Sequence, residues 1–70
     1  MEINEMREQL AACEQFMDAA PTLLRLVRKE CGSRSTQARA MRVGINRVAR
    51  RRDWLEVEIQ WAEMKARAAG

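Results

Sequence analysis

Apolar residues recur along most of this 70-residue chain at alternating spacings of three and four. An α-helix has about 3.6 residues per turn, so this spacing gathers the apolar side chains on one helix face. The first such stripe comprises Ile3, Met6, Leu10, Cys13 and Met17. The second comprises Ala38, Met41, Ile45, Val48, Leu55, Ile59, Ala62 and Ala66, with Arg52 at one core position. The pattern predicts a single domain of the all-α class.

Two residues indicate where helices are expected to end. Pro21 lacks a backbone donor and its ring clashes with the preceding turn, so a break is expected near residues 19–21. The alternative is one kinked helix over residues 3–31, because the apolar spacing continues in register through the proline. Gly32 is a typical C-terminal stop, and Ser33 and Ser35 after it are typical of turns and helix caps.

The segment after Gly32 is compatible with two structures. In one, a helix over 35–43 is followed by a turn at Gly44, and Asn46 caps a further helix over 46–68. In the other, one helix runs from residue 36 to about 68 with Gly44 inside it, at a cost of about 1 kcal/mol. The cap that follows the glycine so closely favours the turn. With helices over 2–19 and 21–31, the expected fold is therefore three to four helices, of which the last is long.

Residues 55–61, LEVEIQW, alternate apolar and polar side chains and would also suit a half-buried strand. A lone strand has no partner in a helical chain, and the following segment is strongly helical, so a helix is predicted here as well. The helix places Trp54, Val57, Trp61 and Met64 on a second apolar face. One helix of a small monomer rarely buries two faces, which indicates a contact with another chain.

The short length of the chain favours self-association. A chain of this size buries only about 60% of the surface that its unfolded form exposes, and oligomerisation is a common source of additional burial. We therefore expect a homodimer. The residues expected at the dimer or partner interface are Leu10, Met17, Trp54, Leu55, Val57, Trp61 and Met64.

The residue types present argue against catalysis. Histidine is absent, so neither Cys13 nor Cys31 has an imidazole to activate it, and the acids are spread over polar helix faces. We predict no enzyme, cofactor, metal site or small-molecule substrate. The thiols are expected to be buried apolar groups, although helices folded back at Pro21 would let them pair. Because no apolar run of membrane-spanning length and no signal-peptide pattern is present, a cytoplasmic protein without a membrane partner is expected.

The net charge of +3 conceals a strong segregation of charge. Residues 1–20 carry a net −4 and residues 53–70 a net −2, whereas residues 21–52 combine ten Lys/Arg with one acid for a net +9. Concentrated positive charge attracts polyanions, and guanidinium groups can clamp phosphates or bond to guanine edges. The expected nucleic-acid contacts are Arg39, Arg42, Asn46, Arg47, Arg50 and Arg51.

The stretch GSRSTQARAMRVGINRVARRR, residues 32–52, resembles the DNA-binding helix-turn-helix of the Fis type, also found at the C-terminus of NtrC-type activators. The matching residues are Gly32, Arg34, Thr36, Gln37, Ala38, Ala40, Gly44, Ile45, Asn46, Arg47, Arg50 and Arg51. The resemblance implies that the helix after Gly44 enters the major groove and that the preceding helices form a dimer core. The family has a leucine three residues after the position of Arg47, where this chain has Arg50.

Two main functions follow from these patterns. The first is a small dimeric regulator that binds double-stranded DNA through its basic helix-turn-helix-like segment. The alternative is a small helical protein, of the kind that phages and mobile elements encode, which binds and inhibits or adapts a partner protein through its basic face and tryptophan stripe. A third hypothesis is a purely structural coiled-coil oligomer.

Overall fold

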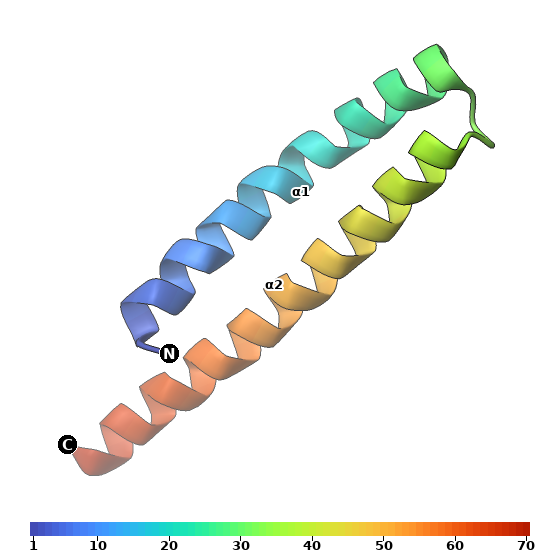
Figure 1. Ribbon diagram of the computed structural model, residues 1–70. Coiled ribbons are helices and arrows are strands. Elements are labelled where there is room, and N and C mark those ends of the chain that lie inside the picture. Colours follow the sequence, from blue (N-terminus) through green and yellow to red (C-terminus); the bar gives the residue numbers. More distant parts are fainter.

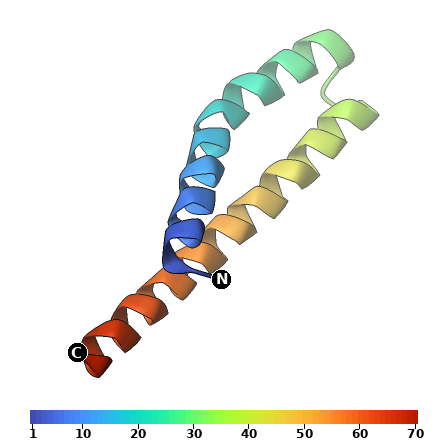
Figure 2. The same cartoon turned by 60° about the vertical axis from the view of Figure 1, so that its left-hand side comes forward.

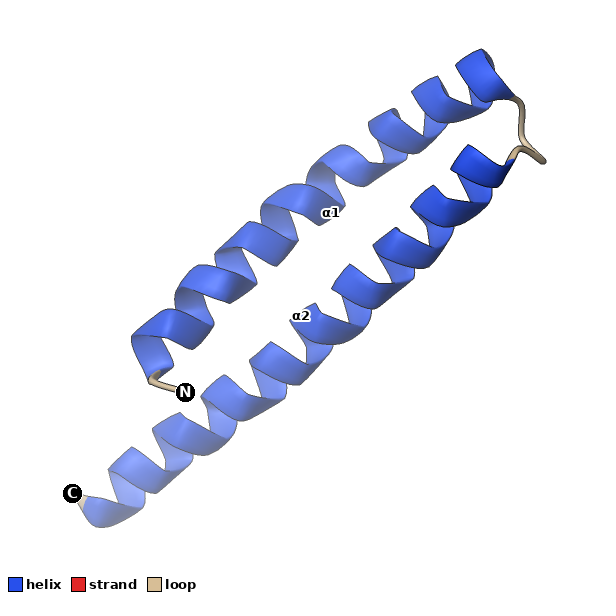
Figure 3. Cartoon of the chain, viewed as in Figure 1, coloured by secondary structure: helices blue, strands red, loops and turns tan.

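The chain folds into two long antiparallel helices joined by a short loop. In the computed structural model, which describes residues 1–70, helix α1 spans Ile3–Cys31 and helix α2 spans Thr36–Ala69 (Figures 1 and 3). The hairpin is narrow and elongated, with extents of 54 × 15 × 14 Å. The all-α prediction is confirmed. The prediction of three to four helices is wrong, because residues 2–19 and 21–31 belong to one helix, and residues 35–43 and 46–68 to the other.

The connection between the helices follows from two residues. Gly32 adopts a φ of +95°, which a residue with a side chain rarely adopts, and its N–H closes α1 by donating to the Arg28 carbonyl at 2.8 Å. Ser35 then opens α2, because its Oγ accepts a hydrogen bond from the Ala38 N–H at 3.1 Å. The same hydroxyl donates to the Gly32 carbonyl at 2.8 Å. The predicted stop at Gly32 is confirmed, and of the two cap candidates, Ser35 and Thr36, Ser35 is the cap.

Helix α1 continues through Pro21, where a break was expected. Proline inside a helix costs about 3 kcal/mol relative to alanine, since it removes one hydrogen bond and crowds the preceding turn. The apolar stripe nevertheless keeps one register from Met17 through Ala20 to Leu24, and Ala20 is buried. A continuous helix therefore keeps both halves of the stripe against α2. Figure 2 shows α1 changing direction in its cyan middle section, the part that contains the proline.

Helix α2 likewise continues through Gly44. Gly32 is the only residue with a positive φ, so Gly44 has an ordinary helical backbone and no turn precedes Asn46. Residues 55–61 are also helical, because Leu55 and Ile59, four positions apart, both face α1. The expected turn is wrong for a physical reason. The loss of about 1 kcal/mol at one glycine is small beside the apolar contacts that a single straight helix makes along α1.

The core lies toward the open end of the hairpin, away from the loop. Met6 from α1 and Leu55 and Ile59 from α2 form a buried cluster, and Leu55 is fully enclosed. The half-buried side chains around this cluster are Ile3, Leu10, Cys13 and Ala62. Toward the loop, the buried residues are Ala20 and Ala38. Small residues there bury little apolar area, so the Leu55 cluster supplies most of the packing that holds the helices together.

Replacement of Leu55 by alanine should therefore destabilise the hairpin severely. Removing a buried leucine side chain typically lowers the free energy of unfolding by about 2–5 kcal/mol, which is a large share of what so small a chain has. Urea denaturation followed by circular dichroism measures the change. Leu26→Ala is the matched control, because Leu26 is 51% exposed and its loss should change the free energy by no more than about 0.5 kcal/mol. Equal effects of the two substitutions would contradict the position of the core.

Alanine substitutions at the two glycines should have opposite signs. A Cβ at Gly44 meets no heavy atom within 4 Å, so Gly44→Ala should raise the free energy of unfolding by about 0.5–1 kcal/mol through helix propensity. Gly32→Ala should lower it by about 1–2 kcal/mol, because the positive φ of Gly32 strains any L side chain. Thermal denaturation of both variants tests this. A destabilising Gly44→Ala would indicate a turn at residue 44 in place of the continuous helix.

Candidate nucleic-acid interface

Because the two helices are antiparallel, the basic and acidic segments of the sequence lie at opposite ends of the hairpin. Residues 21–52 form the loop end of the hairpin, and we call this part the basic half, because ten of its residues are Lys or Arg and one is acidic. The two acidic ends of the sequence, residues 1–20 and 53–70, come together toward the other end, with a combined charge of −6. The hairpin is thus strongly dipolar along its 54 Å length.

The basic half is scarcely neutralised from within the chain. The hairpin has two ion pairs, and one of them, Arg7 with Glu63 at 2.7 Å, joins the two helices near the open end. The other joins Arg52 to its neighbour Asp53 at 3.3 Å. Arg52 is thus the only one of the ten basic residues in the basic half that forms an ion pair. The remaining nine cations have no ion-pair partner within the chain.

The six predicted contact residues all lie on the first half of α2, on two neighbouring faces. Arg39, Arg42 and Asn46 follow one another at spacings of three and four, and so share one face. Arg42 is half-buried and its guanidinium donates to the Ser33 carbonyl at 3.3 Å, which ties it to the loop. Arg39 and Asn46 are exposed.

The second face carries Arg47 and Arg50, both exposed and without an ion-pair partner. Arg50 therefore has no part in the core, and the expectation of a leucine at this place does not apply to a hairpin. Arg51 is more constrained, because its guanidinium donates to Oε1 of Gln9 at 2.9 Å and lies 4.5 Å from the centroid of the Trp54 ring. Arg39, Arg47 and Arg50 are thus the arginines in the first half of α2 that are exposed and whose side chains have no partner within the chain.

The tertiary structure adds cations that were not among the predicted contacts. Arg25, Arg28 and Lys29 lie in the last part of α1, and Arg34 lies in the loop. All four are exposed. These four residues were included in the net charge predicted for residues 21–52. They lie beside the N-terminal half of α2 because the chain reverses direction after Gly32. A hairpin interpretation of the sequence would have included them.

The predicted interface residues separate into two groups. Leu55 is buried inside the hairpin, and Leu10 and Met17 are half-buried, with Leu10 against the Leu55 cluster. The others form an exposed surface that we call the tryptophan face. Its residues, with exposed fractions of 44%, 49%, 56% and 56%, are Trp54, Val57, Trp61 and Met64.

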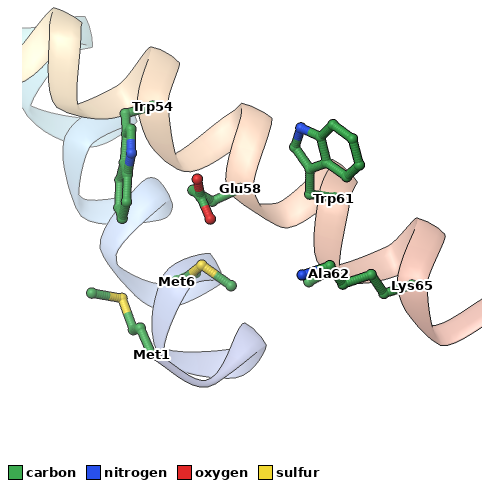
Figure 4. Close-up of a pocket in the computed structure, with 7 residues that line it drawn as sticks. All are labelled: Met1, Met6, Trp54, Glu58, Trp61, Ala62 and Lys65. Atoms are coloured by element: carbon green, nitrogen blue, oxygen red, sulfur yellow. The ribbon is translucent and has the colours of Figure 1, made fainter.

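A shallow hollow of about 340 Å³ lies beside the tryptophan face. In Figure 4, Trp54 and Trp61 lie on α2 on either side of Glu58. The Trp54 side chain extends down toward the side where Met1 and Met6 lie, and the Trp61 ring projects upward. The residues lining the hollow are Met1, Met6, Trp54, Glu58, Trp61, Ala62 and Lys65. This open depression has both apolar side chains and the charged groups of Glu58 and Lys65, which suits a side chain of a partner surface.

The two thiols lie far apart. Cys13 is half-buried against the core and Cys31 is exposed at the end of α1, and both are free. At about 1.5 Å per residue, their positions in one helix differ by about 27 Å, so they cannot pair within the chain. No cluster of three or more cysteine or acidic side chains is arranged to hold a metal ion. Neither helix combines the length and apolar character needed to span a membrane.

No family model, curated protein or solved structure matches the chain. The resemblance of residues 32–52 to the Fis-type helix-turn-helix stays a prediction, and the turn that such a motif has at Gly44 is absent from α2.

Proposed function

We propose that this protein binds double-stranded DNA through contacts of its basic half with the phosphate backbone. The observation that carries the proposal is the concentration of ten cations and one acid in residues 21–52, of which only Arg52 forms an ion pair, with Asp53 outside the segment. Arginine suits this role because its planar guanidinium bonds to phosphate oxygens with two parallel hydrogen bonds. The neutralised phosphates release counterions, which supplies the free energy of binding.

The shape of the hairpin favours contacts with phosphates over contacts with bases. The major groove is about 12 Å wide and admits one helix, whereas the hairpin has a cross-section of 15 × 14 Å with α1 lying along α2. The arginines project from the sides of a long helix, and no recognition helix is set off by a turn. Binding should therefore depend weakly on sequence. A regulatory role would then come from occupancy of the DNA.

Removal of two exposed arginines should weaken DNA binding and reduce its salt dependence. For Arg47→Ala combined with Arg50→Ala, we expect roughly tenfold lower affinity, and a plot of log K against log salt concentration less steep by about 1.8. Fluorescence anisotropy with a mixed-sequence duplex of about 20 base pairs, over about 50–200 mM salt, measures both quantities. A second duplex of unrelated sequence should bind within a few-fold of the first.

The matched control is Arg7→Ala combined with Arg67→Ala. This variant loses the same net charge from the open end of the hairpin, where Arg7 pairs with Glu63. Its affinity and salt slope should stay close to those of the unaltered chain. An unaltered chain that fails to bind DNA at about 50 mM salt, or equal losses in both variants, would sink the proposal.

The tryptophan face supports a second candidate function, the binding of a partner protein. Tryptophan is among the residues that most often anchor protein interfaces, and two of them are about half exposed here. If the protein is a module of this kind, Trp61→Ala should abolish capture of the partner protein and change the affinity for DNA by no more than a few-fold. If Trp61→Ala instead weakens DNA binding and leaves partner capture intact, the function lies in the basic half.

A further inference from the structure

We propose that the tryptophan face binds the same face of a second copy of this chain in antiparallel orientation, so that two hairpins form a four-helix bundle. This inference concerns a different part of the surface from the basic half and does not rest on DNA binding. Three observations support it: the spacing of the exposed apolar residues, the amount of surface that the hairpin leaves exposed, and the distribution of charge along α2.

The spacing is that of a helix-packing seam. Trp54, Val57, Trp61 and Met64 follow one another at spacings of three, four and three, which is the heptad pattern of coiled coils and bundles. The seam that α2 uses against α1 runs through Leu55, Ile59 and Ala62 instead. Helix α2 therefore carries two packing seams over the same turns, and the hairpin occupies one of them.

The hairpin exposes more surface than a compact protein of the same mass, and the excess is about the area that a second copy would cover. A compact monomer of 8.1 kDa has an accessible surface of about 4,500 Å² by the usual scaling with mass, whereas the hairpin exposes 5559 Å². The excess is about 1,000 Å². A protein interface of standard size buries about 800 Å² on each partner. An isologous dimer would thus reduce the exposed surface of each chain to about the area expected for its mass.

The charges on α2 select the antiparallel orientation. Continuing the exposed seam toward the loop leads to Arg50, four residues before Trp54, and then to Arg47, three residues before Arg50. In a parallel dimer each of these arginines would pack against its own copy, and two like charges at a seam repel each other. In an antiparallel dimer the arginines of the two copies lie at opposite ends. With Trp54 facing Met64, Asp53 of one copy is level with Lys65 of the other.

The register follows from matching the ends of the seam. With the two-fold axis midway between Trp54 and Met64, Trp54 of each copy faces Met64 of the other, and Val57 faces Trp61. The hollow between Trp54 and Trp61 in Figure 4 then receives apolar side chains of the second copy. The basic halves extend away from the shared bundle in opposite directions, so Arg47 stays accessible.

Sedimentation equilibrium without DNA tests the contact. The unaltered chain should be a dimer that dissociates on dilution, and Trp61→Ala should raise the dissociation constant at least about 30-fold, as expected for an interface anchor. Leu26→Ala is the control, since it removes an equally exposed apolar side chain from α1 and should leave the constant unchanged. Circular dichroism checks that each variant stays helical. A chain that is monomeric at millimolar concentration, or a dimer insensitive to Trp61→Ala, would overturn the proposal.

A distance between spin labels tests the orientation. Asn46 is exposed. A spin label on Asn46→Cys, in a Cys13→Ala, Cys31→Ala background that leaves no other thiol, reports the distance between the two copies. At about 1.5 Å per residue, the antiparallel register places the two labels about 40 Å apart along the bundle, whereas a parallel dimer places them level with each other. A short distance in the dimer would refute the antiparallel arrangement. Because no DNA is present, this result is independent of whether the basic half binds phosphates.

Discussion

The single apolar seam between α1 and α2 is the interaction on which the rest of the structure depends. The two helices have no other element to pack against, and their contact is concentrated where Leu55 and Ile59 meet Met6. Most helical stability in proteins comes from packing of an apolar face, so the stability of both helices depends on this contact. The seam also explains why α1 tolerates Pro21 and α2 tolerates Gly44. The apolar side chains that the helices bury against each other keep both helices continuous through these residues.

The same seam also determines how charge is distributed along the hairpin. Because it is antiparallel, it folds the acidic beginning and end of the chain toward one end of the hairpin and leaves the basic middle at the other. The basic half has little internal compensation, and the tryptophan face lies on the following turns of α2. The two proposals therefore use separate parts of one helix. Self-association uses Trp54, Val57, Trp61 and Met64, and Arg47 stays available for phosphates, whereas Arg50 lies at the edge of the dimer contact.

Local signals predicted the ends of the helices well where the chain reverses, and poorly where it does not. Gly32 and Ser35 act through their own backbone and side chain, so their roles could be recognised from residue type alone. Pro21 and Gly44 were expected to break helices because their local cost was weighed without the packing that opposes it. The seam continued in register through both residues, and that continuity was the better indication. The leucine that the resembling family has at the position of Arg50 has no counterpart here, and Arg50 is exposed, because the hairpin lacks the turn of that motif.

The sequence by itself determined the helical class, the position of the loop and the segregation of charge, since each of these depends on residue type and spacing over short distances. Only the tertiary structure decided that there are two helices, that Leu55 lies inside the hairpin while Trp54 and Trp61 lie outside it, and that the cations of α1 join those of α2 at one end. The physical reason is that these features depend on which face of each helix is buried. Helix α2 has two apolar faces within one sequence, and the choice between them is made by contact with α1.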